Sequence, residues 1–335
     1  MKILYRLLIF LLIFGLSSAY AQTPAPAKDS KEKITIAQFG KERFLLYLPL
    51  YVAMEEGIFT KHGLTVDLKF AGNDDQIFAA VISGAAQIGV GDPVFTAISH
   101  DKGGPGKVVA MMLTNLGVGG VAIDPKVPMI KTPDNLDGLR IGSLPEPSTT
   151  YTLLSGVKKH YGLNLQIVQA PIDGQAALVE AGKVDIAVVL EPDASILEDK
   201  GFRRVFDLAK WTDPQVITGF TATEDFIKAH PETIQKVVDS LQEALNIIYK
   251  DPQVAYRTGK KLYPNLSDKV VHTAVDHMLS ENMYPHSAIV PDELWQRTLK
   301  TRLDSDELKK PQATTIAVDN SFAIQAGKDV GVAAP

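Results

Sequence analysis

The stretch QIFAAVISGAAQIGVGDP occupies residues 76–93, and a similar stretch, QAALVEAGKVDIAVVLEP, occupies residues 175–192. Each begins with a helical apolar pattern, passes through a glycine into a short apolar strand pattern, and ends in an acidic residue followed by proline. The offset between matching positions stays near about 99 residues, and a constant offset is typical of an internal repeat. Two copies are too few for a solenoid. The sequence therefore predicts two α/β lobes of similar topology.

Helices and short strands alternate around these stretches. Residues 34–37 predict a buried strand, and residues 64–70 alternate between apolar and polar side chains as a half-buried strand does. This order indicates α/β layers with a mainly parallel sheet in each lobe. After Trp211 the pattern becomes helical, and residues 232–250 carry apolar side chains three and four positions apart. We expect this added helical C-terminal region to pack back onto the first lobe.

Composition limits the possible chemistry. The 335 residues are 45% hydrophobic, which is enough for about two domains with buried cores. The formal net charge of −5 argues against a nucleic-acid partner. The absence of cysteine excludes disulfides, thiolate metal sites and cysteine nucleophiles. His272 and His277 are five positions apart, a poor spacing for metal ligands on a helix, so we expect both on a solvated surface, with no metal site and no cofactor.

The N-terminus predicts export. A short basic region precedes the apolar run of residues 7–16, and small residues follow at 19–21, which is the pattern of a secretory signal peptide. The alternative is a membrane anchor, but the run is shorter than the roughly 20 residues that a spanning helix needs. We therefore expect a signal peptide at residues 1–21, a flexible leader at residues 22–33 and a periplasmic protein.

Residues 49–59, PLYVAMEEGIF, and residues 61–64, KHGL, begin a series of family-like motifs. The series continues with SG at 83–84, IGVGD at 88–92, LDGLRIG at 136–142, STT at 148–150, GKVDIA at 182–187, EP at 191–192 and VDNSF at 318–322. In this order the motifs resemble the ABC-importer substrate-binding proteins for nitrate, taurine, aliphatic sulfonates and thiamin-pyrimidine precursors.

The resemblance implies a type II-like periplasmic binding protein with two lobes, two crossings and a ligand cleft between the lobes. It implies a first lobe made of residues 34–122 and 214–335, and a second lobe made of residues 123–213. Ligands of open α/β sheets bind beyond the carboxyl ends of strands. The candidate ligand-binding residues at those ends are Gln38, Phe39, Tyr47, Asn73, Asp92, Thr114, Asn115, Ser148, Thr149, Thr150 and Glu191.

Three groups among these candidates carry the chemistry. Small hydroxyl residues at 148–150 offer donors at a helix start, where the family receives the polar or anionic end of a ligand; the alternative is a plain helix cap. Asp92 and Glu191, together with Glu146, favour a ligand with N–H donors over a bare anion if two or more of these acids face the cleft. Phe39 and Tyr47, with Phe44, predict an aromatic wall for a flat or apolar ligand, with core packing as the alternative.

The resemblance implies a monomeric, extracytoplasmic solute-binding protein of an ABC importer that docks on a membrane permease and catalyses nothing. Its lobes would close on a small organic solute, either sulfonate- or taurine-like or a small nitrogen-containing or aromatic compound. Two alternatives stay open at this point. One is an enzyme on the same scaffold, related to pyrimidine-forming enzymes that depend on cysteine and histidine positions. The other is a sensory module that presents its ligand to a membrane receptor.

Overall fold

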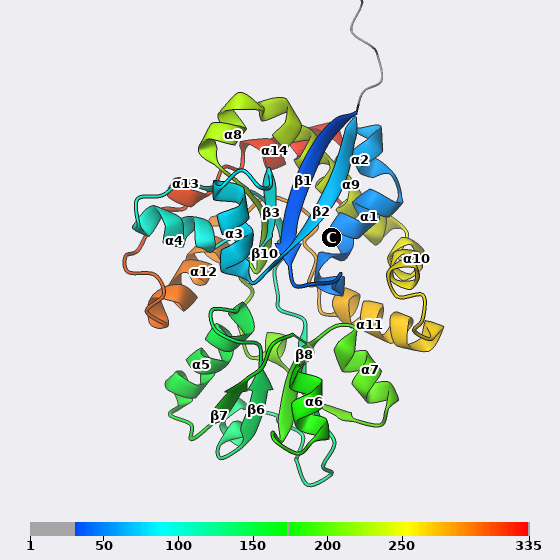
Figure 1. Cartoon of the computed structure of the whole chain (residues 1–335), viewed down its shortest axis with the longest axis vertical. Coiled ribbons are helices and arrows are strands. Elements are labelled where there is room, and N and C mark those ends of the chain that lie inside the picture. Colours follow the sequence, from blue (N-terminus) through cyan, green and yellow to red (C-terminus); the bar gives the residue numbers. More distant parts are fainter. Residues whose placement is uncertain (1–30, 173, 334–335) are drawn as a thin grey trace, which may run out of the picture. The chain divides into compact units, whose positions relative to one another are not determined.

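The computed structural model describes residues 31–172 and 174–333, and these residues form two five-stranded sheets flanked by helices (Figure 1). The first sheet has the order β2 (Leu64–Gly72), β1 (Glu32–Phe39), β3 (Ile88–Gly91), β10 (Thr218–Ala222) and β4 (Lys107–Leu113). The second has the order β7 (Gln166–Gln169), β6 (Arg140–Ser143), β8 (Ile186–Leu190), β5 (Val118–Ala122) and β9 (Arg203–Asp207). The predicted two-lobed α/β fold is confirmed.

The two sheets have the same topology. Strands β1, β2 and β3 pair in parallel, as do β6, β7 and β8, while β10 and β5 are antiparallel to both of their neighbours. In each sheet the antiparallel strand is the one that directly follows a crossing from the other lobe: β5 in the second sheet and β10 in the first. The chain therefore runs along this strand in the direction opposite to its neighbours. Helix α3 (Asp74–Ile82) with β3, and α6 (Gly174–Glu180) with β8, are the two copies of the repeat and occupy equivalent places.

The lobes are joined at residues 114–117, between β4 and β5, and at residues 208–217, between β9 and β10. The predicted boundary after residue 122 is wrong, because β5 pairs with β8 and β9 of the second sheet. Only four residues separate two apolar strands here, so the sequence shows no break where the chain changes lobe. Strand β1 begins at Glu32, inside the expected leader, and the expected signal peptide lies outside the described residues.

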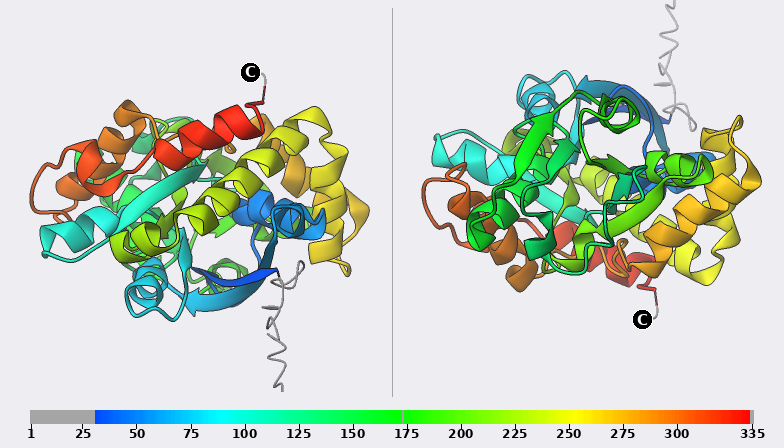
Figure 2. Two further views of the ribbon diagram at one scale, coloured as in Figure 1. Left: turned by 90° about the horizontal axis from the view of Figure 1, so that it is seen from above. Right: turned by 90° about the horizontal axis from the view of Figure 1, so that it is seen from below.

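The C-terminal helices cover the first lobe, as expected (Figure 2). They are α8 (Glu224–Ala229), α9 (Pro231–Lys250), α10 (Gln253–Leu262), α11 (Asp268–Ser280), α12 (Asp292–Asp304), α13 (Thr314–Ala317) and α14 (Ser321–Asp329). The apolar face of α9 is fully buried against α1 (Leu48–Glu55) and α14, which explains its three-and-four spacing.

Two of these helices also reach the second lobe. Helix α11 contacts α7 (Asp193–Asp199), and α12 contacts α5 (Thr149–Tyr161). Helices α2 (Ile58–Lys61) and α4 (Phe95–Asp101) complete the first lobe. Among the helices of the described ranges, none combines the length and the apolar content needed to cross a membrane.

Gly89 lies in β3, where side chains of α3 and β10 pack against the strand. A Cβ atom added there would lie 2.7 Å from Thr221 Oγ1 and 3.0 Å from Ile77 Cγ2. Both neighbours are β-branched and stiff, so the backbone has to move instead. We expect Gly89→Ala to lower the free energy of unfolding by about 1–3 kcal/mol, measured by urea unfolding. The control is Gly142→Ala in β6, where the nearest atom is 3.4 Å away; equal midpoints for the two variants would contradict the prediction.

Candidate functional site

A cavity of about 30 Å³ lies between the lobes, at the carboxyl ends of β1, β3, β6 and β8. Its lining comes from both lobes and both crossings: Phe39, Leu46, Tyr47, Asp74, Asp92, Leu116, Leu144, Ser148, Thr149, Thr150, Leu190, Ile217 and Thr218. This volume holds about two water molecules, so an organic solute requires the surrounding groups to move apart.

Several predicted site residues line this cavity together: Phe39, Tyr47, Asp92, Ser148, Thr149 and Thr150. The fold brings them together because each follows the end of a strand or begins a helix at the facing edges of the two sheets. Ser148 is also the cap of α5, since its hydroxyl accepts a hydrogen bond from the Tyr151 amide at 3.3 Å. The helix-cap alternative therefore holds for Ser148, which lines the cavity as well.

Other predicted residues do not line the cavity. The amide of Gln38 is buried and accepts a hydrogen bond from Tyr51 Oη at 3.0 Å. Asn73 forms the capping box at the start of α3. The Thr114 hydroxyl donates to backbone carbonyls just beyond α11, and Asn115 is half-buried beside it in the first crossing. These side chains stabilise the elements around the cavity.

Asp74 lines the cavity although the sequence analysis did not select it. Its Oδ1 accepts the Asp92 backbone N–H at 3.0 Å. Burial, and next the nearby charge of Asp92, raise the pKa of Asp74 to about 7. Burial, followed by the charge of Asp74, also raises the pKa of the Tyr47 hydroxyl well above its ordinary value. The cavity thus contains two acids, and burial raises the pKa of one of them, Asp74, toward neutral pH.

Arg302 is the second residue that the sequence analysis missed. Its side chain on α12 is 2% exposed and donates to the Asp92 carboxylate, to Thr149 Oγ1 at 3.0 Å, to Thr152 Oγ1 at 2.6 Å and to Glu307 Oε2 at 2.7 Å. Burial by itself lowers the pKa of Arg302, but the charges of Asp92 and Glu307 raise it above its ordinary value. Arg302 and Asp92 are 210 residues apart, so no local sequence pattern could predict that they pair.

Glu191 faces away from the cavity. Its carboxylate accepts hydrogen bonds from Arg204 and from Ser195 Oγ at 2.8 Å, and His277 Nδ1 lies 2.8 Å from Glu191 Oε1. Burial by itself raises the pKa of Glu191. The hydrogen bond with His277 and the charge of Arg204 outweigh this effect and bring the pKa below its ordinary value. The expectation of a solvated helix surface holds for His272, which is exposed, whereas His277 is half-buried and contacts Glu191 and Arg204.

Glu191, Glu198 and His277 place potential metal ligands within 4.8 Å of one another. However, Arg204 Nη2 lies at hydrogen-bonding distance from all three side chains. A guanidinium already supplies the positive charge there, so a metal ion would have to displace it. These contacts make the cluster an ion-pair network centred on Arg204.

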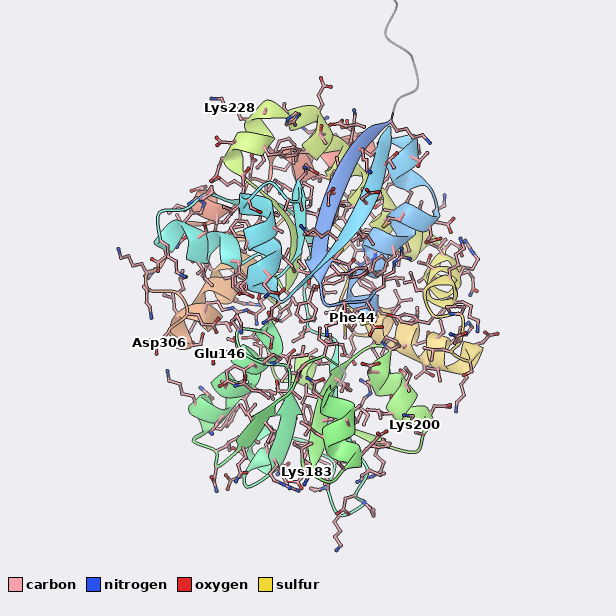
Figure 3. The ribbon with its side chains drawn as sticks, viewed as in Figure 1. Phe44, Glu146, Lys183, Lys200, Lys228 and Asp306 are labelled. Atoms are coloured by element: carbon pink, nitrogen blue, oxygen red, sulfur yellow. The ribbon has the colours of Figure 1, made fainter. Side chains whose placement is uncertain are left out.

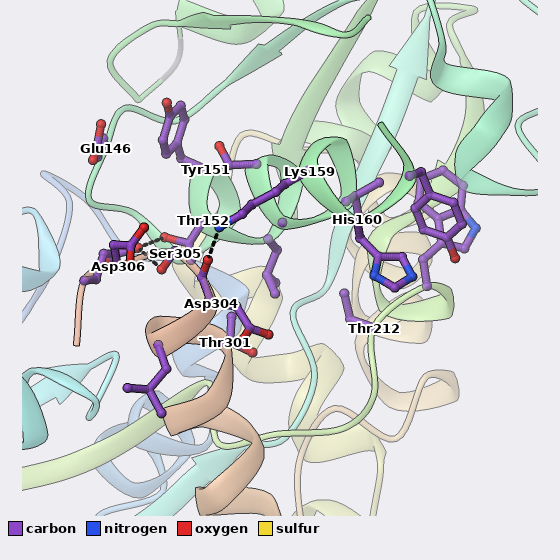
Figure 4. Close-up of a pocket in the computed structure, with 18 residues that line it drawn as sticks. Glu146, Tyr151, Thr152, Lys159, His160, Thr212, Thr301, Asp304, Ser305 and Asp306 are labelled. Carbon is purple, nitrogen blue, oxygen red and sulfur yellow. Dashed lines mark hydrogen bonds between the residues drawn. The ribbon is translucent and has the colours of Figure 1, made fainter. Parts of the chain in front are cut away.

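A groove of about 860 Å³ is lined by α5, the end of α12 and the second crossing (Figure 4). The aromatic side chains that line it are Tyr151, His160, Tyr161 and Trp211. Lys159 Nζ spans it by donating to the Asp304 carbonyl at 2.8 Å. Thr152 and Glu307, both bonded to Arg302, also line the groove, so the contacts of Arg302 separate it from the cavity.

We expect Glu191→Gln to lower the free energy of unfolding by about 2 kcal/mol, because it leaves the buried Arg204 with one anionic partner fewer. Thermal or urea unfolding measures the loss. The control is Glu180→Gln, which breaks an exposed pair with Lys200 and should change stability by less than about 0.5 kcal/mol. Equal stability of both variants would show that Glu191 is not a structural ion-pair residue.

The raised pKa of Asp74 predicts that the free energy of unfolding depends on pH. The folded protein binds the Asp74 proton more tightly than an unfolded chain does, because the aspartate pKa of an unfolded chain is about 3.9. The contribution of this proton to the free energy of unfolding is therefore complete below a pH of about 4 and is lost as the pH rises through about 7. Asp74→Asn carries no charge and keeps an acceptor for the Asp92 amide. Its stability relative to the natural protein should rise by about 1 kcal/mol or more between pH 4 and 8, measured by urea unfolding. Asp75→Asn, at the exposed neighbouring position, is the control; the same trend in both variants would refute the assignment.

Residues 46–255 match the family described as NMT1/THI5 like. The 4-amino-5-hydroxymethyl-2-methylpyrimidine phosphate synthase THI13 of Saccharomyces cerevisiae (strain ATCC 204508 / S288c) is 20% identical over 237 residues, which cover 66% of this chain and 69% of that protein.

Two solved structures show the same fold. The alkanesulfonate-binding protein SsuA from Xanthomonas axonopodis pv. citri, bound to MOPS, is 17% identical with a TM-score of 0.69, over 86% of this chain and 98% of that one. The periplasmic nitrate-binding protein NrtA from Synechocystis PCC 6803 is 12% identical with a TM-score of 0.68, over 89% of each chain. The resemblance found in the sequence is confirmed, and with residues 46–255 of its 335 matched, the chain belongs to the NMT1/THI5-like family.

Proposed function

We propose that this protein is the extracytoplasmic solute-binding protein of an ABC importer and that it closes its two lobes on a small organic solute. The observation that supports this most directly is the cavity, which residues of both lobes line at the carboxyl ends of four strands. Open α/β sheets bind ligands at such edges. The family membership and the binding-protein neighbours of the same fold agree with a binding role.

The lining favours a particular solute chemistry. Asp74 and Asp92 place carboxyl oxygens in the cavity that accept hydrogen bonds, and nitrate has no hydrogen-bond donor to offer them. Leucine and isoleucine side chains line the cavity together with the hydroxyl residues Ser148, Thr149, Thr150 and Thr218, and Phe39 and Tyr47 add aromatic rings. A solute with N–H donors on a partly apolar or flat body matches these groups better than nitrate does.

Closure of the lobes supplies the mechanism. A solute that contacts both lobes gains its full binding free energy only when they are closed, so it shifts the population toward the closed form. The crossings at residues 114–117 and 208–217 are the segments that absorb the change in backbone angles. In this proposal the closed monomer docks on a membrane permease, after export to the periplasm by the N-terminal signal.

An enzyme on this scaffold is the second candidate, because the yeast relative is named as a synthase. Asp74 and Asp92 are a pair of carboxyl groups with different environments, as acid–base catalysis requires. Binding and catalysis differ in one observable: a binding protein returns its solute chemically unchanged. A sensory role differs only in the membrane partner, which a pull-down from membranes identifies.

A thermal-shift screen tests the proposal, with amines, amino acids, aminosulfonates, aminopyrimidines, aromatic acids, sulfonates and nitrate as probes. A solute at a hundred times its dissociation constant should stabilise the protein by about 2.7 kcal/mol. We expect a nitrogen-bearing organic probe to give the largest shift and to be recovered intact by mass spectrometry. A probe converted into product would favour the enzyme, and a nitrate response alone would contradict the solute chemistry.

The aromatic wall gives a sharper test with the probe that responds most strongly. Phe39→Leu removes the ring from the cavity and keeps an apolar side chain, so calorimetric titration should show affinity about three- to tenfold weaker. Phe70→Leu is the matched control, because Phe70 is 41% exposed on β2 and does not line the cavity. Equal affinities in the two variants would place the solute elsewhere.

A further inference from the structure

Two arginine clusters join the lobes. At the contact of α5 with α12, Arg302 of the first lobe bonds Thr149 and Thr152 of the second. At the contact of α7 with α11, Arg204 and Glu191 of the second lobe contact His277 of the first. Both contacts lie beside the cavity. The cavity residue Asp92 is bonded to Arg302, and the cavity residue Leu190 immediately precedes Glu191 in the sequence.

The ion pairs of Arg302 stay within one lobe. Asp92 and Glu307, its two carboxylate partners, both belong to the first lobe. Its partners in the second lobe are the neutral hydroxyls of Thr149 and Thr152. Separating the lobes therefore costs hydrogen bonds but leaves no buried charge unpaired, whereas breaking a buried ion pair strongly destabilises a protein.

We propose that Arg302 is a positioning residue for lobe closure, which holds the two lobes together in the absence of solute through Thr149 and Thr152. We call Arg302, Asp92, Glu307, Thr149 and Thr152 the clasp. The two carboxylates hold the guanidinium in place, and its remaining N–H groups meet the two hydroxyls on the first turn of α5. Hydrogen bonds to a charged donor are stronger than neutral ones, and the 2% exposure of Arg302 excludes competing water.

The clasp also uses groups that line the cavity. Thr149 Oγ1 donates to Asp92 Oδ2 at 2.5 Å, and both residues belong to the cavity wall. If the proposed solute-binding function is correct, a solute that enters the cavity competes with the clasp for Asp92 and Thr149. The clasp itself does not depend on that function, because it is a property of the protein without solute.

The test measures the distance between the lobes in solute-free protein. The chain has no cysteine, so Lys228→Cys and Lys183→Cys introduce dye sites at opposite ends of the two lobes (Figure 3). In this background Thr149→Val with Thr152→Val keeps the side-chain shape and removes both hydroxyls. We expect lower energy transfer between the dyes, with the closed-to-open ratio reduced by about tenfold, because charge-assisted hydrogen bonds across the lobes are lost.

Matched variants separate the clasp from a general loss of folding. Thr149→Ser with Thr152→Ser keeps both hydroxyls and should restore the energy transfer of the parent. Thr258→Val changes a buried threonine of α10 that does not line the cavity, and it should leave the energy transfer unchanged. The proposal is overturned if the double valine variant, folded by circular dichroism, shows the same energy transfer as Thr258→Val. Because no solute is present, this outcome does not depend on whether the solute-binding function is correct.

Discussion

The structure depends on neutralising two buried acids at equivalent places, Asp92 after β3 and Glu191 after β8. A buried carboxylate is costly unless a cation and hydrogen-bond donors accompany it. Arg302 and Arg204 meet this requirement, one for each lobe. Because Arg302 lies on α12, the C-terminal helices have to return to the first lobe and reach the edge of the cleft. The long helical tail thus supplies the cationic partner of a cavity carboxylate.

The two acids differ in their surroundings although the repeat places them alike. The arginine beside Glu191 comes from β9 of the same sheet and holds that carboxylate away from the cavity. The arginine beside Asp92 comes from a distant helix and leaves this carboxylate at the cavity wall, next to Asp74. One lobe therefore contributes the acids, and the other contributes the hydroxyls of α5. This asymmetry is what gives the proposed solute site its polarity.

Contacts between the lobes follow a common rule in both clusters. The strong ion pairs of each arginine stay within its own lobe, and the groups contacted across the cleft are hydroxyls or an imidazole. Such an arrangement lets two rigid lobes meet and separate without isolating a buried charge. It suits a protein that works by changing the population of a closed form.

The sequence alone determined the fold class, the two copies of the repeat and the buried face of α9, because these follow from apolar periodicity and from motifs a few residues long. It also selected Phe39, Tyr47, Asp92 and the hydroxyls at 148–150, since strand ends of parallel sheets meet at one edge. Only the tertiary structure decided that β5 joins the second sheet, that Glu191 turns away from the cavity and that Arg302 meets Asp92. Each of these depends on partners far apart along the chain, for which no local periodicity exists, so packing and charge neutralisation in the folded protein determine them.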